Sequence, residues 1–155
     1  MCPFLNVVLV APEIPQNTGN VGRLCLAAGA RLHLVEPLGF ELDEKHLRRA
    51  GLDYWDRVDM KVWSSFTALY ANAGTAAKFW FFTTKVQRDY WDVDYTRGDY
   101  LVFGRETRGL PESLLAEHAE NCVTIPMGKD VRSINLATAV GIGTYEALRR
   151  ISTTG

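Results

Sequence analysis

The sequence is poor in cysteine and in any pattern that binds a metal. The three cysteines, Cys2, Cys25 and Cys122, are an odd number without C-x-x-C spacing, so neither a disulfide framework nor a zinc site is expected. The three histidines are scattered, and none has a carboxylate or cysteine at ligand spacing. The sequence therefore predicts no metal centre.

Long apolar runs and an excess of charge are also missing. No apolar stretch approaches the roughly 18 residues of a membrane span, so no membrane partner is expected. Reduced thiols in a chain without a signal peptide favour the cytoplasm. The formal net charge is −1, so RNA binding would depend on a local patch of Lys and Arg. A hydrophobic fraction of 47% over 155 residues is typical of one soluble domain, residues 1–155.

Short apolar runs alternate with stretches that have helical periodicity. Strands are predicted at residues 5–10, 32–35, 79–83, 100–103 and 123–125. Helices are predicted at residues 19–28, 43–49, 66–73 and 134–150, the first ended by Gly29 and the third capped by Ser64 or Ser65. The aromatic run in the third strand must be covered on both faces. The alternation predicts an α/β fold, a three-layer sandwich with a mostly parallel sheet.

Three polar blocks each follow a predicted strand and lead into a helix-like stretch. The first block is residues 15–23, the second is residues 103–111, and the third is residues 125–136. Because the carboxyl ends of parallel strands lie at one edge of a sheet, we expect the three blocks to meet at one site.

The first block is suited to hold an anion. Gly19 and Gly22 lie where a helix is expected to begin, and backbone N–H groups at a helix start bind anions. Asn17 is expected in the preceding loop, and Arg23 near the second helical turn, where its guanidinium could hold a phosphate. An asparagine turn followed by a surface arginine explains the same pair equally well.

The second and third blocks offer hydrogen-bonding groups. Gly104 would let a ligand approach the backbone, and Glu106 could bind a hydroxyl or amine or hold an arginine, although a solvated surface carboxylate is the simpler alternative. Residues 125–127 suit an adenine-sized ring. Of Ser133 and Asn135, one is expected to cap the last helix.

Several common catalytic signatures are absent. The chain has no G-x-G-x-x-G dinucleotide motif after a strand, no G-x-S-x-G elbow and no Walker sequence. Chemistry at this site must therefore come from Arg, Glu, Ser and Asn side chains, together with a cofactor that carries the reactive group.

The three blocks closely resemble those of the SPOUT-class RNA methyltransferases, whose C-terminal part forms an α/β trefoil knot. More narrowly, the chain is similar to the small bacterial tRNA (cytidine/uridine-2′-O)-methyltransferases of the TrmL type, from residue 6 to about residue 150. The matching motifs are residues 12–15 and 17–20 with Arg23, and residues 36–40, 48–54, 83–85, 104–111 and 132–136. Gln16 and Arg105 stand where proline is common in these enzymes, and Ala137 stands where serine is common.

This resemblance implies a knot over roughly residues 78–150 that binds S-adenosylmethionine in a bent form and releases S-adenosylhomocysteine. It implies 2′-O-methylation of the wobble nucleotide 34, a cytidine or modified uridine, in leucine tRNAs. The implied cofactor residues are Phe82, Thr83, Gly104, Glu106, Ile125, Met127 and Ser133. The implied catalytic residues are Arg23, Asn17, Glu106, Ser133 and Asn135.

In the mechanism implied by the resemblance, Arg23 helps to remove the proton of the ribose 2′-hydroxyl. Arginine is normally always protonated, so its residue chemistry favours a phosphate-positioning role. The resemblance also implies a homodimer, each site completed by the partner subunit, acting on the anticodon loop. The expected RNA-binding residues are Arg23, Arg48, Arg49, Arg105, Arg108, Lys129 and Arg132.

Three other functions remain open on the sequence. The same chemistry could act at another tRNA position or on ribosomal RNA. A cofactor-binding RNA chaperone without turnover would share the cofactor loops. A nucleotide-binding regulatory domain of flavodoxin-like architecture would share the fold, since a fold does not define a function.

Overall fold

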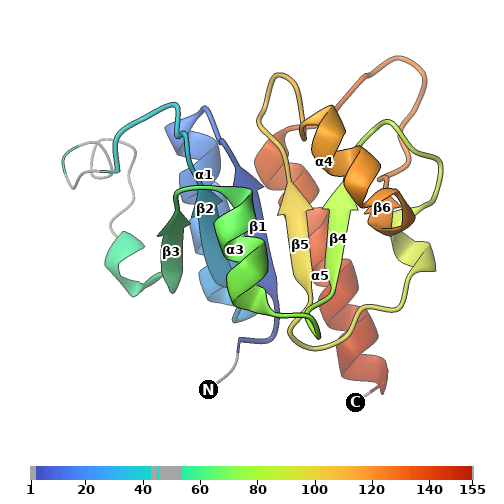
Figure 1. The fold of residues 1–155 in the computed structure, drawn as a ribbon, viewed down its shortest axis with the longest axis horizontal. Helices are drawn as coiled ribbons and strands as arrows, with labels where there is room; N and C mark the ends of the chain where they lie inside the picture. Colours follow the sequence, from blue (N-terminus) through green and yellow to red (C-terminus); the bar gives the residue numbers. More distant parts are fainter. Residues whose placement is uncertain (1–2, 43–44, 46–53, 155) are drawn as a thin grey trace.

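A parallel β-sheet forms the centre of the structure (Figure 1). The computed structural model describes residues 3–42, 45 and 54–154. Within these residues, six strands lie in the order β3-β2-β1-β5-β4-β6, and each pairing between neighbours is parallel. The strands are β1 (Asn6–Val10), β2 (Arg31–Val35), β3 (Met60–Trp63), β4 (Phe79–Phe82), β5 (Tyr100–Phe103) and β6 (Cys122–Val123).

Helices cover both faces of this sheet. Figure 1 shows α1 (Pro15–Ala28) and α5 (Leu136–Thr154) behind the strands, with α3 (Phe66–Ala73) and α4 (Glu112–Glu117) in front. Short 3-10 helices are η1 (Trp55–Arg57), η2 (Tyr90–Asp92) and η3 (Ala119–Asn121). The predicted α/β sandwich is confirmed. The trefoil knot stays a prediction, because strand order and pairing do not describe how the chain is threaded.

Alternating side chains divide the core into two parts. On β1, Val7 and Leu9 pack in the cluster that contains α1 and α5, while Val8 packs in the cluster that contains α3. On β4, Trp80 and Phe82 belong to the first cluster, and residues 79 and 81 belong to the second. The aromatic run is therefore buried on both faces, as its sequence predicts. Each such side chain contributes roughly 1.5–3 kcal/mol when fully buried.

Helix α1 begins earlier than expected. It starts at Pro15, four residues before the predicted start, and ends at Gly29, whose φ of 72° is left-handed. Proline is suited to the first helical position because that position needs no N–H partner inside the helix. Asn17, expected in a loop, therefore lies in the first turn of the helix. The prediction that the helix would begin near Gly19 was wrong.

Other boundaries also differ from the sequence prediction. Helix α3 is confirmed at residues 66–73, and the Ser65 hydroxyl caps it by accepting a hydrogen bond from the Ala68 N–H at 3.1 Å. Helix α5 begins two residues later and ends four residues later than expected. Strand β6 lies one residue earlier and is shorter than residues 123–125. The helix predicted at residues 43–49 lies outside the described residues.

The sequence did not reveal β3 and α4. Strand β3 is an edge strand whose four side chains are all at least partly exposed, so it has no continuous apolar signal. Helix α4 has only six residues, too few to show a helical period. Among the described helices, none has the length and hydropathy needed to span a membrane.

A buried histidine on β2 joins this strand to its neighbours β1 and β3. His33 is only 3% exposed, and its Nδ1 accepts a hydrogen bond from the Trp63 indole N–H at 3.0 Å. Its Nε2 therefore carries the proton of the neutral ring and donates it to the Asn6 Oδ1 at 2.9 Å. Burial, and to a smaller extent the positive charge of the nearby Arg31, lowers the pKa of His33 to about 4. His33 is thus a structural residue and not a catalyst.

This histidine makes stability depend on pH. Below about pH 6.5 the unfolded chain protonates His33, but the folded chain keeps it neutral until about pH 4. The free energy of unfolding should therefore fall as the pH drops through this window, by on the order of 3 kcal/mol. Urea unfolding at pH 7 and pH 4.5 measures the effect, with His33→Gln as control. An equal pH dependence in both proteins would contradict the role given to His33.

Candidate active site

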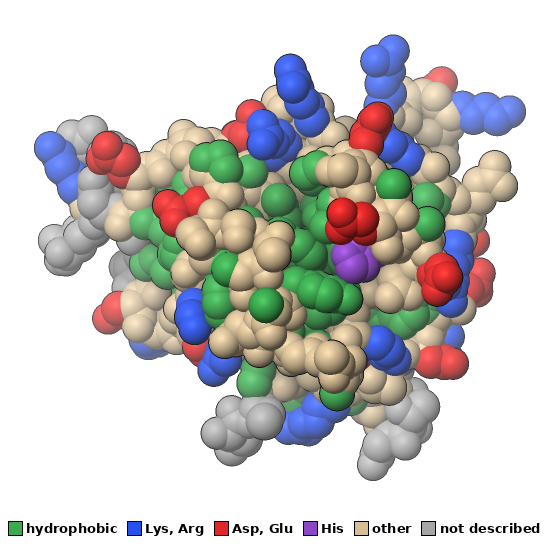
Figure 2. Space-filling model, viewed as in Figure 1, with side chains coloured by type: hydrophobic (Ala, Val, Ile, Leu, Met, Phe, Trp, Pro, Cys, Tyr) green, Lys and Arg blue, Asp and Glu red, His purple; other side chains and the backbone are tan. Residues whose placement is uncertain are grey.

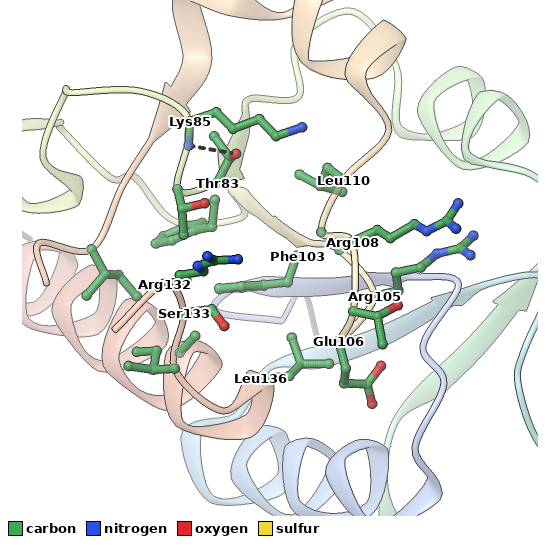
Figure 3. Close-up of a pocket in the computed structure, with 18 of the residues that line it drawn as sticks. Thr83, Lys85, Phe103, Arg105, Glu106, Arg108, Leu110, Arg132, Ser133 and Leu136 are labelled. Atoms are coloured by element: carbon green, nitrogen blue, oxygen red, sulfur yellow. Dashed lines mark hydrogen bonds between the residues drawn. The ribbon is translucent and has the colours of Figure 1, made fainter. Parts of the chain in front are cut away.

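The second and third blocks enclose one pocket at the carboxyl ends of β4 and β5 (Figure 3). Its volume is about 290 Å³. Apolar side chains form part of the wall: Figure 3 shows Phe103 near the centre of the view and Leu136 below it, with Thr83 above and Ser133 to the left. The residues expected to bind the cofactor all line it: Phe82, Thr83, Gly104, Glu106, Ile125, Met127 and Ser133. The structure thus brings this set together, and its binding role stays a prediction.

Gly104 allows the second block to fold back on itself. A Cβ atom at this position would lie 2.0 Å from the carbonyl carbon of Gly109 and 2.2 Å from the Leu110 nitrogen. The Gly109 N–H donates to the Arg105 carbonyl at 3.0 Å, and Gly109 itself has a φ of +67°. Gly104 was expected to admit a ligand, but its structural reason is the close approach of the chain's own backbone.

The Glu106 carboxylate binds the start of helix α1. One oxygen accepts from the Glu13 N–H at 2.7 Å, and the other accepts from the Ile14 N–H at 2.8 Å. Ile14 is the residue that precedes the helix, and its own side chain makes no cap. Glu106 therefore caps α1, although it lies 92 residues from Ile14 in the sequence. A carboxylate is favoured at a helix start because of the unpaired N–H groups and the helix dipole there.

This contact changes the interpretation of the first block. A carboxylate of the protein itself binds the N–H groups at the start of α1. The expectation that a ligand anion binds near Gly19 and Gly22 stays a prediction. A reciprocal contact strengthens the link between the start of α1 and the second block. Glu13 Oε1 accepts from the Thr107 hydroxyl at 2.7 Å and from the Thr107 N–H at 3.0 Å. Both hydrogen bonds lower the pKa of Glu13, and the one from the Thr107 hydroxyl has the larger effect.

A hydrogen-bond chain continues from Glu106 into the third block. The Asn17 amide donates to a Glu106 oxygen at 3.1 Å, and its Oδ1 accepts from the Asn135 amide at 3.1 Å. Asn135 Oδ1 in turn accepts from the Thr138 N–H at 3.2 Å, so Asn135 is the cap of α5. Three of the expected catalytic residues therefore form one network that links all three blocks.

The other two expected catalytic residues lie apart from this network. Ser133 lines the pocket, whereas Arg23 is exposed on α1 and lies outside the pocket lining. The Arg23 guanidinium lies 5.9 Å from the centre of the Tyr54 ring, and the Tyr54 hydroxyl donates to the Gly19 carbonyl at 2.7 Å. Trp55 packs on Gly22 so closely that a Cβ there would lie 2.5 Å from its ring. Tyr54 and Trp55 thus brace the helix that carries Arg23.

The expected RNA-binding residues divide into groups. Arg105, Arg108 and Arg132 line the pocket, while Lys129 is exposed and does not. Arg48 and Arg49 lie outside the described residues. Sequence reasoning missed Lys85, another cation of the pocket lining, although it belongs to a motif that carries the family resemblance. Among the described residues, no cluster of His, Cys, Asp or Glu could hold a metal ion.

A parallel sheet with a pocket at its strand ends, built by loops and rich in hydrogen-bonding groups, defines a ligand-binding α/β protein. The chain belongs to the SpoU rRNA Methylase family, whose profile matches residues 4–145.

Individual relatives agree with this assignment. The tRNA (cytidine(34)-2′-O)-methyltransferase of Burkholderia cenocepacia (strain HI2424) is 49% identical over 151 residues, which is 95% of this chain and 96% of the relative. A solved structure concerned with the 2-OH methylation of C/U34 on tRNA superposes with a TM-score of 0.91 and 45% identity, covering 97% of this chain and 98% of the other. An AdoMet-bound rRNA methyltransferase from Sinorhizobium meliloti has a TM-score of 0.83 and 26% identity, covering 96% of this chain and 58% of the other.

Proposed function

We propose that this chain transfers the methyl group of S-adenosylmethionine to the ribose 2′-hydroxyl of nucleotide 34 in tRNA. Relatives named for this reaction match nearly the whole chain, and the cofactor is bound in a related solved structure. The observation that carries the proposal is the network of Glu106, Asn17 and Asn135, which joins the pocket to the helix that carries Arg23. Within each subunit, the network thereby fixes the cofactor pocket to the helix that presents Arg23.

The pocket has the size and chemistry for S-adenosylmethionine. Its volume of about 290 Å³ lies near the lower end for pockets that hold small ligands. Phe82, Phe103 and Ile125 offer an apolar wall for the adenine ring, and Thr83 and Ser133 offer hydroxyl groups. When bound, the cofactor supplies an activated methyl group on sulfur. Glu106 holds the pocket wall in place, because both of its oxygens are already used by α1.

The chain's own residues must bring the ribose to this methyl group and remove a proton from its hydroxyl. Arg23 binds the phosphate next to the target ribose, since a guanidinium is well suited to hold a phosphate through two N–H groups. Asn135 and Ser133 orient the ribose or the cofactor by hydrogen bonds. Holding the hydroxyl oxygen in line with the methyl group lowers the barrier by avoiding the entropy cost of a chance encounter.

The position of Arg23 supports a homodimer. This residue lies on α1 outside the pocket of its own chain, so a second copy that presents its α1 would complete the site. Helices α1 and α5 also carry exposed apolar side chains on their layer of the molecule: Leu26 is 39% exposed and Tyr145 is 49% exposed. Burying such residues favours association. The dimer would bind the tRNA substrate at its anticodon loop. It would act in the cytoplasm.

A direct assay tests the proposal. The purified protein is incubated with S-adenosylmethionine and total tRNA, and the modified nucleotide is mapped. Methylation of the 2′-hydroxyl at position 34 is expected, and the tRNAs that carry it identify the isoacceptors. Ribosomal RNA is included because the family is described as rRNA methylases. Methylation of ribosomal RNA or of another tRNA position would replace this proposal, and cofactor binding without transfer would indicate an RNA chaperone.

Removal of the arginine side chain separates catalysis from cofactor binding. Arg23→Ala should abolish methyl transfer, by about 100-fold or more, because the substrate phosphate loses its partner. Isothermal titration should still detect S-adenosylmethionine binding of nearly normal affinity, since Arg23 does not line the pocket. Arg97→Ala is the matched control, an exposed arginine in the turn before β5, at the opposite end of the strands. An active Arg23→Ala enzyme would refute the role of Arg23.

A further inference from the structure

A second hollow lies beside the pocket, along the outer side of the second block. Its volume is about 500 Å³. We call it the basic cleft, and its lining residues are Lys85, Arg105, Arg108, Gly109, Leu110, Pro111 and Glu112. Most of these residues, from Lys85 to Leu110, also line the pocket, so the two hollows are continuous.

The basic cleft carries an excess of positive charge. Figure 3 shows Arg105 and Arg108 extending side by side away from the pocket, with Lys85 projecting from the opposite wall. In the part of the chain that the structure describes, neither guanidinium forms a hydrogen bond or a close ion pair, although the charges of both act on the Glu13 carboxylate and lower its pKa. Figure 2 shows Lys and Arg side chains gathered along the upper edge of the molecule, above the carboxyl ends of the strands. The cleft therefore offers unpaired donors to an anionic ligand.

One carboxylate already occupies part of this cleft. Lys85 Nζ donates to Glu112 Oε1 at 3.1 Å, and the two side chains are 51% and 87% exposed. An ion pair this exposed contributes little to stability, so an incoming anion can displace the carboxylate at low cost. Glu112 thus stands where a phosphate oxygen would bind.

We propose that the basic cleft binds the phosphate backbone of the RNA strand that leads to or from the methylated ribose, and that Glu112 competes with this phosphate for Lys85. The proposal rests on the proposed function. The cleft floor, residues 109–111, has no aromatic side chain on which a base could stack. Contacts of this kind position a strand without reading its sequence. The cleft would therefore hold the substrate in register beside the cofactor.

Opposite effects of two substitutions test this inference. Lys85→Ala should weaken tRNA binding by about 3- to 10-fold and reduce the slope of log affinity against log salt by about 0.7. Glu112→Gln should strengthen tRNA binding by about 2- to 5-fold, because the competitor for Lys85 is removed. Fluorescence anisotropy with labelled tRNA measures both effects.

Matched controls exclude a general effect of charge. Lys61→Ala removes an exposed lysine on edge strand β3, and Glu117→Gln removes an exposed carboxylate near the end of α4. Neither control should change tRNA affinity more than about 1.5-fold, since neither residue lines the cleft.

The outcomes separate this inference from the proposed function. If the wild-type protein methylates nucleotide 34 while Lys85→Ala and Glu112→Gln bind tRNA normally, only the cleft inference is overturned. The inference also fails if Glu112→Gln weakens binding, or if Lys85→Ala lowers the affinity for S-adenosylmethionine and leaves that for tRNA unchanged. If Lys85→Ala weakens tRNA binding and Glu112→Gln strengthens it, but the wild-type protein transfers no methyl group, the cleft inference stands and the enzymatic proposal fails.

Discussion

The contact between the Glu106 carboxylate and the start of helix α1 is the interaction on which the site depends. Its two oxygens accept from the Glu13 and Ile14 N–H groups and from the Asn17 amide. Hydrogen bonds to a charged acceptor are stronger than neutral ones, each worth roughly 1.5–3 kcal/mol. Because Glu106 also lines the pocket, one side chain fixes the pocket wall and the helix relative to each other.

The three blocks that this hydrogen-bond network links have different structural roles. The second and third blocks form the pocket, while the first block supplies a helix that is held by Glu106 at its start and braced by Tyr54 near its middle. Arg23 is therefore presented on a rigid element, and a site built on rigid elements keeps its geometry better than one built on loops. The basic cleft extends the same surface beyond the pocket.

Much of the architecture follows from local sequence signals, because these signals act over short distances. The Ser65 cap of α3 and the buried aromatic run of β4 are both readable in a few residues. The partner of Glu106 is not, since the Ile14 N–H lies 92 residues away and only the folded sheet brings the two together. The misreading of Gly104 has a different origin, because its close neighbour is the backbone only five residues ahead. That contact is local in the sequence, but the residue types do not show that the chain folds back there. The convergence of the three blocks was predictable, but the hydrogen bonds that their side chains form with one another were not.

One measurement tests this account most directly. Glu106→Gln keeps the size of the side chain but removes its charge and turns an amide NH₂ toward N–H donors, so the clamp on α1 should loosen. We predict that the single-turnover rate of methyl transfer, at saturating S-adenosylmethionine and tRNA, falls about 100-fold in a protein that remains folded. A wild-type rate in this variant would contradict the claim that Glu106 holds pocket and helix together.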